Sequence, residues 1–93
     1  MSVEISDNAL RCVDGLAWRR VDDDVYVFRM DGSLHVLEGG VSQFLWETLD
    51  SGEATHESLL KGMLSAFNVE TEVAKNDLDE FLAGLLTAGL LVG

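Results

Sequence analysis

The spacing of hydrophobic residues changes at Gly39-Gly40, and this change constrains the fold of the 93-residue chain more than any other feature. Before the two glycines, apolar residues stand in short runs rich in β-branched and aromatic side chains, which is typical of strands. After them, apolar residues recur every three or four positions, which is typical of helices that bury one face. Strands and helices that occupy separate blocks indicate an α+β fold.

Three antiparallel strands are predicted in the first block, over residues 16–21, 25–30 and 33–38. An acidic turn at residues 22–24 joins the first two strands, because aspartates readily bond their own backbone. Asp31-Gly32 joins the second and third strands as a two-residue hairpin turn, because both residues tolerate positive φ. The prediction is a meander of three strands.

The two-residue turn also predicts the register of the hairpin, with Met30 opposite Ser33 and Phe28 opposite His35. Both faces of this sheet carry apolar side chains, whereas a sheet with one wet face alternates cleanly between apolar and polar residues. One face is therefore expected to pack against the helices. The other is covered by the N-terminal segment, by a second copy of the chain in a homodimer, or by a ligand, and the sequence leaves these alternatives open.

Three helices are predicted in the second block, each by one apolar stripe. The stripes are Val41, Phe44, Leu45, Thr48 and Leu49; Leu59, Leu60, Met63, Leu64 and Phe67; and Ala74, Leu78, Phe81, Leu82, Leu85 and Leu86. Thr55 and Thr71 suit the N-cap positions of the second and third helices, and Gly89 suits a left-handed C-terminal cap. The apolar residues 90–92 are expected to fold back on the core. Three strands followed by three helices have the parts of a winged helix-turn-helix.

The length fits one domain, which we place at residues 16–93, with residues 1–15 as a loosely held N-terminal arm of weak periodicity. Cys12 is the only cysteine, so neither an intramolecular disulfide nor a cysteine-based metal site is expected. The first ten residues carry Glu4 and Asp7 and lack the apolar run of a signal peptide. No stretch reaches the ~20 apolar residues of a membrane span, so a cytoplasmic location is expected.

Acidic side chains outnumber basic ones by 17 to 6, and the formal net charge is −11. Because proteins that bind nucleic acids or anionic membranes cluster lysines and arginines, this balance argues against both partners. A basic peptide or a basic enzyme surface would be attracted. An acidic surface that only keeps the chain soluble is the alternative.

The sequence holds no recognisable catalytic or cofactor-binding motif, so we expect no enzyme activity, no metal and no cofactor. His35 and His56 lack a third partner at the spacing of zinc ligands. Gly39-Gly40 is followed by no phosphate-binding lysine, and the neighbouring Glu38 would repel an anion. No nucleophile stands in an evident pairing with a base.

From Val25 onward, the chain resembles the PqqD-like family, also called RiPP recognition elements, through short motifs in the family's order. An R-x-D-G hairpin at residues 29–32 leads into a strand that ends Val-Leu. The pattern G-x-x-x-x-x-W-E-x-L-D-x-G covers residues 40–52, and the start of a second helix follows with Thr55, Glu57 and Leu59. The pattern N-D-L-x-x-F-L-x-x-L-x-x-x-G-L-L covers residues 76–91.

The resemblance implies a non-catalytic, winged-helix-like domain that binds the leader of a ribosomally made precursor peptide and serves a separate peptide-modifying enzyme. In this family, an extended leader adds a strand beside the third strand, and its side chains enter between that strand and the third helix. The implied contacts on the strand are Ser33, Leu34, His35, Val36 and Leu37. On the third helix we select the flank of Val73, Asp77 and Phe81, because Val73 and Phe81 would form the floor of a pocket. The strand carries no lysine or proline to block pairing, as expected of an edge that is used, and Asp77 would meet a basic leader side chain.

Three alternatives stay open beside this interpretation. A winged-helix DNA-binding domain needs a basic recognition helix, but residues 71–88 hold Lys75 against four acidic side chains, which argues strongly against it. A homo-oligomerising scaffold would use the second apolar face of the sheet. For the groove itself, the flank of the third helix that carries Lys75, Asp79 and Ala83 is the alternative lining.

Overall fold

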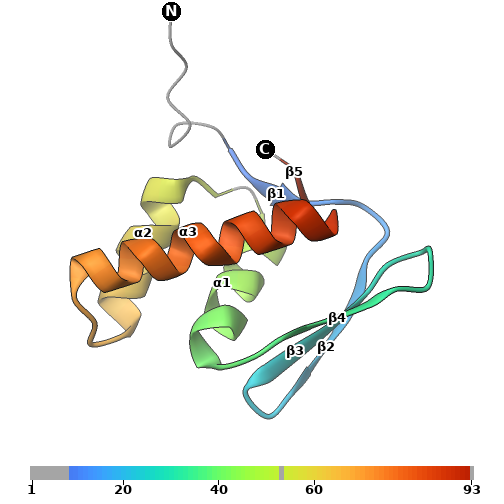
Figure 1. Cartoon of the computed structure of the whole chain (residues 1–93), viewed down its shortest axis with the longest axis horizontal. Coiled ribbons are helices and arrows are strands. Elements are labelled where there is room, and N and C mark those ends of the chain that lie inside the picture. The colour runs from blue at the N-terminus through green and yellow to red at the C-terminus, as the bar shows by residue number, and fades with distance from the viewer. Residues whose placement is uncertain (1–8, 53, 93) are drawn as a thin grey trace, which may run out of the picture.

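The computed structural model describes residues 9–52 and 54–92, with the helices following the sheet (Figure 1). The strands are β1 (Arg11–Cys12), β2 (Ala17–Val21), β3 (Asp24–Phe28), β4 (Leu34–Leu37) and β5 (Leu91–Val92). The helices are α1 (Gly40–Asp50), α2 (His56–Ala66) and α3 (Thr71–Ala88). Because β2, β3 and β4 form an antiparallel sheet in that order and three helices follow, the α+β prediction is confirmed.

The hairpin between β3 and β4 has a three-residue loop, so the predicted two-residue turn is wrong. Gly32 N–H donates to the Arg29 carbonyl and Arg29 N–H donates to the Ser33 carbonyl, both at 3.0 Å. Gly32 has a φ of 89°, the left-handed conformation that closes a three-residue loop with a bulge. Phe28 consequently lies opposite Leu34 and not opposite His35.

This one-residue shift exchanges the two faces of β4, because neighbouring side chains in a strand point in opposite directions. His35 and Leu37 share the inner face with the buried residues of β3, Val25 and Val27. Leu34 and Val36 lie on the outer face and are 48% and 43% exposed. Exposed Phe28 and Val21 extend this apolar outer face across the sheet.

The sheet is held against α1 by an aromatic contact and by two polar contacts. Trp46, which is fully buried, meets Trp18 of β2 edge-on, with ring centroids 6.3 Å apart and ring planes at 82°. Gly39 N–H donates to Asp24 Oδ1 at 3.0 Å, where the sheet passes into α1. Arg20 pairs with Glu47 at 3.2 Å on the surface, where such a pair adds little stability.

The helices bury one stripe each, with Leu45, Trp46 and Leu49 from α1, Leu59 and Met63 from α2, and Ala74, Leu78, Leu82 and Leu85 from α3. Thr55 caps α2 as predicted, since Thr55 Oγ1 accepts from Ser58 N–H at 3.0 Å and Ser58 Oγ accepts from Thr55 N–H. The predicted N-cap at Thr71 is wrong, because Glu70 is the N-cap residue. The Glu70 carbonyl accepts a hydrogen bond from Ala74 N–H, so α3 begins at Thr71, one residue earlier than predicted. Gly89 takes the predicted left-handed conformation, with a φ of 76°.

The two ends of the described chain lie together. β1 pairs with β5, and residues 90–92 fold back on the core as predicted, with Leu90 and Leu91 buried. Leu10 exchanges backbone hydrogen bonds with Ala54 and is itself buried. Residues 1–8 of the expected arm lie outside the described residues, and from Leu10 onward the chain is tied to the fold.

Candidate functional site

β4 is an edge strand, because the sheet order gives it a neighbour on one side only. Arg29 N–H donates to the Ser33 carbonyl, and hydrogen-bonded pairs alternate along an antiparallel ladder. The backbone groups of His35 and Leu37 therefore face β3, and those of Leu34 and Val36 face away. Outside the β3–β4 ladder, no hydrogen bond among the residues that the structure describes uses the backbone of Leu34 or Val36. β4 thus offers a row of donors and acceptors to another extended chain.

A groove of about 480 Å³ runs between this edge and α3. It is lined by Leu34, His35, Val36, Leu37 and Glu38 from the strand side, Ser42 from α1, and Glu80, Phe81, Gly84, Leu85, Ala88 and Leu90 from α3 and its C-terminal end. A second hollow of about 350 Å³ shares Ser42, Glu80 and Phe81 with the groove and adds Asp77. The second hollow therefore adjoins the groove along α3.

The structure brings most of the sequence-predicted site residues to this groove. Leu34, His35, Val36 and Leu37 line it along β4, whereas Ser33 belongs to the hairpin end: its N–H donates to Asp31 and its carbonyl accepts from Arg29.

On α3, Phe81 and Asp77 share one flank: Phe81 lines the groove beside β4, and Asp77 lines the second hollow, whose other wall is α1. Val73 is on the same flank, one turn before Asp77, but it is 47% exposed and lines neither hollow.

Several lining residues were missed from the sequence: Glu38, Ser42, Glu80, Gly84 and Ala88. For the residues on α3, helical spacing was the available signal, because positions 77, 81, 84 and 88 recur at three or four residues along one flank and position 80 lies four residues before 84. Gly84 and Ala88 are small, so the groove stays open where they face β4. A pattern search for apolar stripes passes over such residues.

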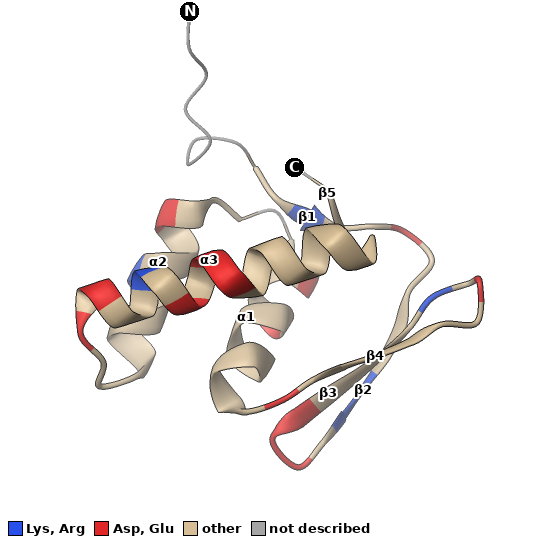
Figure 2. Cartoon of the chain, in the orientation of Figure 1, with Lys and Arg blue, Asp and Glu red and all other residues tan. Residues whose placement is uncertain are grey.

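The groove is acidic toward the middle of α3. Glu38 and Glu80 line it, Asp77 lines the adjoining hollow, and none of the three forms an ion pair among the described residues. Figure 2 shows the acidic bands along the first half of α3. Unpaired carboxylates beside a groove favour a cationic partner.

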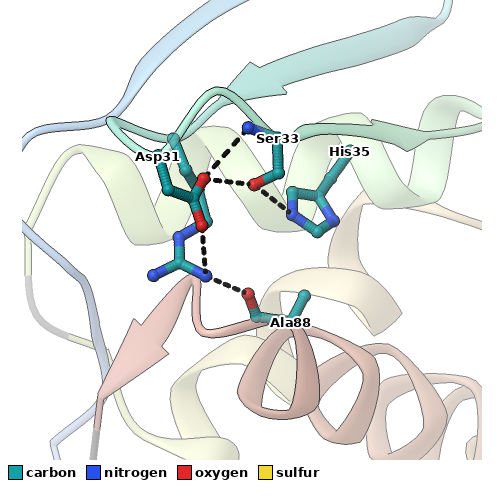
Figure 3. Close-up of polar contacts among 5 residues, drawn as sticks. Asp31, Ser33, His35 and Ala88 are labelled. Atoms are coloured by element: carbon teal, nitrogen blue, oxygen red, sulfur yellow. Dashed lines mark hydrogen bonds and ion pairs between the residues drawn. The ribbon is translucent and has the colours of Figure 1, made fainter.

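The other end of the groove holds a polar network (Figure 3). Asp31 Oδ1 accepts from Ser33 Oγ at 2.7 Å and from Ser33 N–H at 3.0 Å, and Ser33 Oγ lies 3.3 Å from His35 Nε2. These hydrogen bonds, from the Ser33 side chain first, lower the pKa of Asp31 below its ordinary 3.8, with smaller help from Arg29 and His35. The network fixes the tip of the hairpin.

Arg29 ties this tip to the end of α3. Its Nη1 donates to the Ala88 carbonyl at 3.2 Å and lies 3.7 Å from Asp31 Oδ2. A cation suits the C-terminal end of a helix, where carbonyls lack intrahelical partners. Gly89 leaves room for the guanidinium, since a Cβ there would lie 3.0 Å from Nη1. Arg29 therefore links the β3–β4 hairpin to α3 at this end of the groove.

Metal-binding and nucleophilic features are sparse. Across residues 9–52 and 54–92, no three histidine, cysteine or acidic side chains are grouped closely enough to hold a metal ion. Burial, followed by the charge of Asp50, raises the pKa of the Cys12 thiol to about 11, so it is a poor nucleophile at neutral pH. No helix in the described part of the chain is long and apolar enough to cross a bilayer.

Comparison with solved structures finds two similar chains. TbiB1 in complex with the TbiA(beta) leader peptide has a TM-score of 0.78 and 24% identity, covering 89% of this chain and 95% of that one. Lasso peptide synthetase B1 complexed with the leader peptide has a TM-score of 0.73 and 14% identity, covering 90% and 98%. At these identities the likeness shows a shared fold. No curated protein sequence matches the chain.

The family comparison extends across the helical block. The model of the family described as "Coenzyme PQQ synthesis protein D (PqqD)" matches residues 39–91, from the corner before α1 to the first residue of β5. This is more than half of the chain. The match contains α3, the helix that lines the groove beside the β4 edge. The chain belongs to the PqqD family.

Proposed function

We propose that the chain is a non-catalytic adaptor that binds the leader of a ribosomally made precursor peptide and presents it to a separate modifying enzyme. One observation carries this proposal: the free backbone edge of β4 borders a groove whose opposite wall is α3. Both structural neighbours are, by their names, complexes with leader peptides, which supports the same function here.

Strand addition gives the mechanism. The free N–H and C=O groups of Leu34 and Val36 pair with an extended leader, and these main-chain bonds supply affinity without regard to sequence. Leader side chains alternate between the two faces of the extended sheet. One set enters the groove toward Phe81 and Leu85, where pocket shape supplies specificity, and the other set continues the outer apolar face beside Leu34 and Val36.

Electrostatics favours a basic leader. The net charge of −11 attracts a cationic peptide at long range, and carboxylates lie near the binding site, Glu80 in the groove and Asp77 in the adjoining hollow. A short added strand orders a flexible peptide, so we expect a micromolar Kd, about −8 kcal/mol. Binding of this strength tethers the peptide and raises its effective concentration near an enzyme, yet allows release.

The mapping experiment uses displayed random peptides of ~15 residues, enough to span a strand of typical length. Peptides enriched on the immobilised protein are titrated into ¹⁵N-labelled protein. We expect the largest amide shifts at Leu34 and Val36 and on the groove flank of α3, around Phe81 and Gly84. Enriched peptides that shift only amides elsewhere would reject the site, and failure to enrich any peptide would reject the function.

A second candidate function, a homo-oligomerising scaffold, is supported by the outer sheet face. Phe28, Leu34 and Val36 are more than two-fifths exposed there, and apolar side chains gathered on one face mark interaction surfaces. Sedimentation equilibrium separates the two functions. A monomer at micromolar concentration supports the adaptor, and a dimer that excludes the enriched peptides supports the scaffold.

A further inference from the structure

The network at the hairpin tip determines where the proton of His35 lies. The pKa of Asp31 is below its ordinary value, so at neutral pH this carboxylate only accepts hydrogen bonds. Ser33 has one hydroxyl proton and donates it to Asp31 Oδ1 at 2.7 Å. Ser33 Oγ must then accept at its 3.3 Å contact with His35 Nε2. The neutral His35 ring therefore carries its proton on Nε2 and an acceptor lone pair on Nδ1.

The Nδ1 atom is available to a ligand. His35 lies on the inner face of β4, opposite buried Val27, and its side chain lines the groove. No hydrogen bond among the described residues engages Nδ1. Among the described residues, Trp46 Nε1 is the one side-chain nitrogen or oxygen atom that is buried without a hydrogen-bond partner. Since Nδ1 of His35 also lacks a partner but is not buried in this sense, it is in contact with solvent. The structure thus holds an oriented acceptor that has no protein partner.

The lining around this end of the groove makes the acceptor distinctive. The residues that line the groove here have no polar side chains; they are Leu37, Leu85, Ala88 and Leu90. A peptide side chain that covers His35 displaces the water at Nδ1, and it either replaces that hydrogen bond or leaves the nitrogen unpaired. Groups of this kind discriminate strongly between ligands that carry a donor and ligands that lack one.

We propose that His35 determines specificity in the groove, by accepting at Nδ1 a hydrogen bond from a leader side chain that bears a hydroxyl or amide N–H. This inference rests on the proposed leader-binding function. Ser33 and Asp31 act as positioning residues, since they hold the ring in one tautomer. Arg29 holds the same network at a fixed place relative to α3 through its bond to Ala88.

The tautomer is measured first, by long-range ¹H–¹⁵N correlation spectra of the ¹⁵N-labelled full chain above the titration range of histidine. We expect His35 to show a protonated Nε2 and an unprotonated Nδ1. Ser33→Ala removes the acceptor for Nε2–H, so we expect this variant to populate both tautomers. A protonated Nδ1 in the unmodified protein would overturn the inference.

The specificity is then measured by peptide selection on the unmodified protein, on His35→Phe and on His35→Asn. Phenylalanine keeps a planar ring without nitrogens, and the asparagine amide restores an acceptor near the position of Nδ1. We expect the unmodified protein and His35→Asn to enrich peptides with a hydroxyl or amide side chain at one position. We expect His35→Phe to enrich apolar residues there, with a switch of about tenfold in relative affinity.

His56→Gln is the matched control, because His56 bonds Asp79 at 2.7 Å and lines no part of the groove. It should select the same peptides as the unmodified protein. If every variant enriches groove-binding peptides with the same residue preference, the role of His35 is refuted while the adaptor function stands. If the unmodified protein enriches no peptide, the adaptor function itself fails, and this inference fails with it.

Discussion

The thiol of Cys12 illustrates, for a single residue, how the fold changes reactivity. Its pKa is raised from 9.0 to about 11, mainly by burial and further by Asp50. At pH 8 the thiolate fraction is then about 100-fold lower than in the unfolded chain, and the thiolate is the nucleophile. We expect iodoacetamide to modify the folded protein about 100-fold more slowly than the urea-unfolded protein. Equal rates would show that the thiol is not protected.

The same shift predicts a pH dependence of stability. Because the unfolded chain loses the thiol proton at the lower pKa, raising the pH favours unfolding. The contribution of Cys12 is complete below pH 9 and is lost as the pH rises to about 11. Urea unfolding of the protein and of Cys12→Ser should therefore diverge over this window. Parallel pH profiles of the two proteins would contradict the prediction.

The Asp31 carboxylate gives a second prediction for a single residue, with the opposite sign. Its pKa is lowered chiefly by the hydrogen bond from the Ser33 hydroxyl. Its contribution to stability is therefore present above pH 3.8 and is lost as the pH falls. In Ser33→Ala, we expect a ¹³C-detected titration to move the Asp31 pKa up toward 3.8. Ser42→Ala, which removes a hydroxyl elsewhere in the groove, should leave it unchanged.

Among the elements, the β3–β4 hairpin decides which side chains face the groove. The Asp-Gly pair predicts a tight turn at this place but fits both a two-residue loop and a three-residue loop with a final glycine. The structure takes the longer loop, so His35 and Leu37 face inward while Leu34 and Val36 face outward. Local sequence fixes the presence of the hairpin, and packing of Val25 and Val27 against the helices selects its register.

Gly32 is the residue on which this loop depends. Its φ is 89°, and an added Cβ would meet no atom within 4 Å, so only the backbone conformation resists substitution. We expect Gly32→Ala to lower the free energy of unfolding by about 1 kcal/mol. Gly40→Ala is the control, because Gly40 has no positive φ and opens α1, where alanine is the better helix former. Urea denaturation of both variants tests the difference, and an equal effect would contradict it.

The helical half was more predictable than the groove it helps to form. Apolar stripes at helical spacing identified all three helices, because burial of one face dominates their packing. Which residues of α3 line the groove depends on the flank that packs beside β4, and tertiary packing decides this. The family resemblance indicated the third helix, and side-chain chemistry then selected Asp77 and Phe81. Gly84 and Ala88 were missed because small residues leave no apolar signal.

For the whole molecule, the excess of negative charge gives a prediction about association. Basic peptides enriched on the protein should associate more slowly as salt is added, because screening weakens long-range attraction. Asp77→Asn should slow association about threefold at low ionic strength, an effect that shrinks in high salt. Asp79→Asn makes the same charge change outside the groove lining and should have a smaller effect. Equal effects of the two variants would show that Asp77 contributes no more to association than a carboxylate outside the groove.

The adaptor account rests on main-chain pairing at β4, and one substitution tests it most directly. Val36 N–H faces away from β3, so proline at this edge position removes a donor that the fold does not use. Val36→Thr keeps the N–H and the branched side chain as a control. For an enriched peptide, we predict that Val36→Pro weakens binding tenfold or more, about 1.4 kcal/mol, with far-ultraviolet circular dichroism unchanged. Undiminished affinity in a folded Val36→Pro protein would contradict the account.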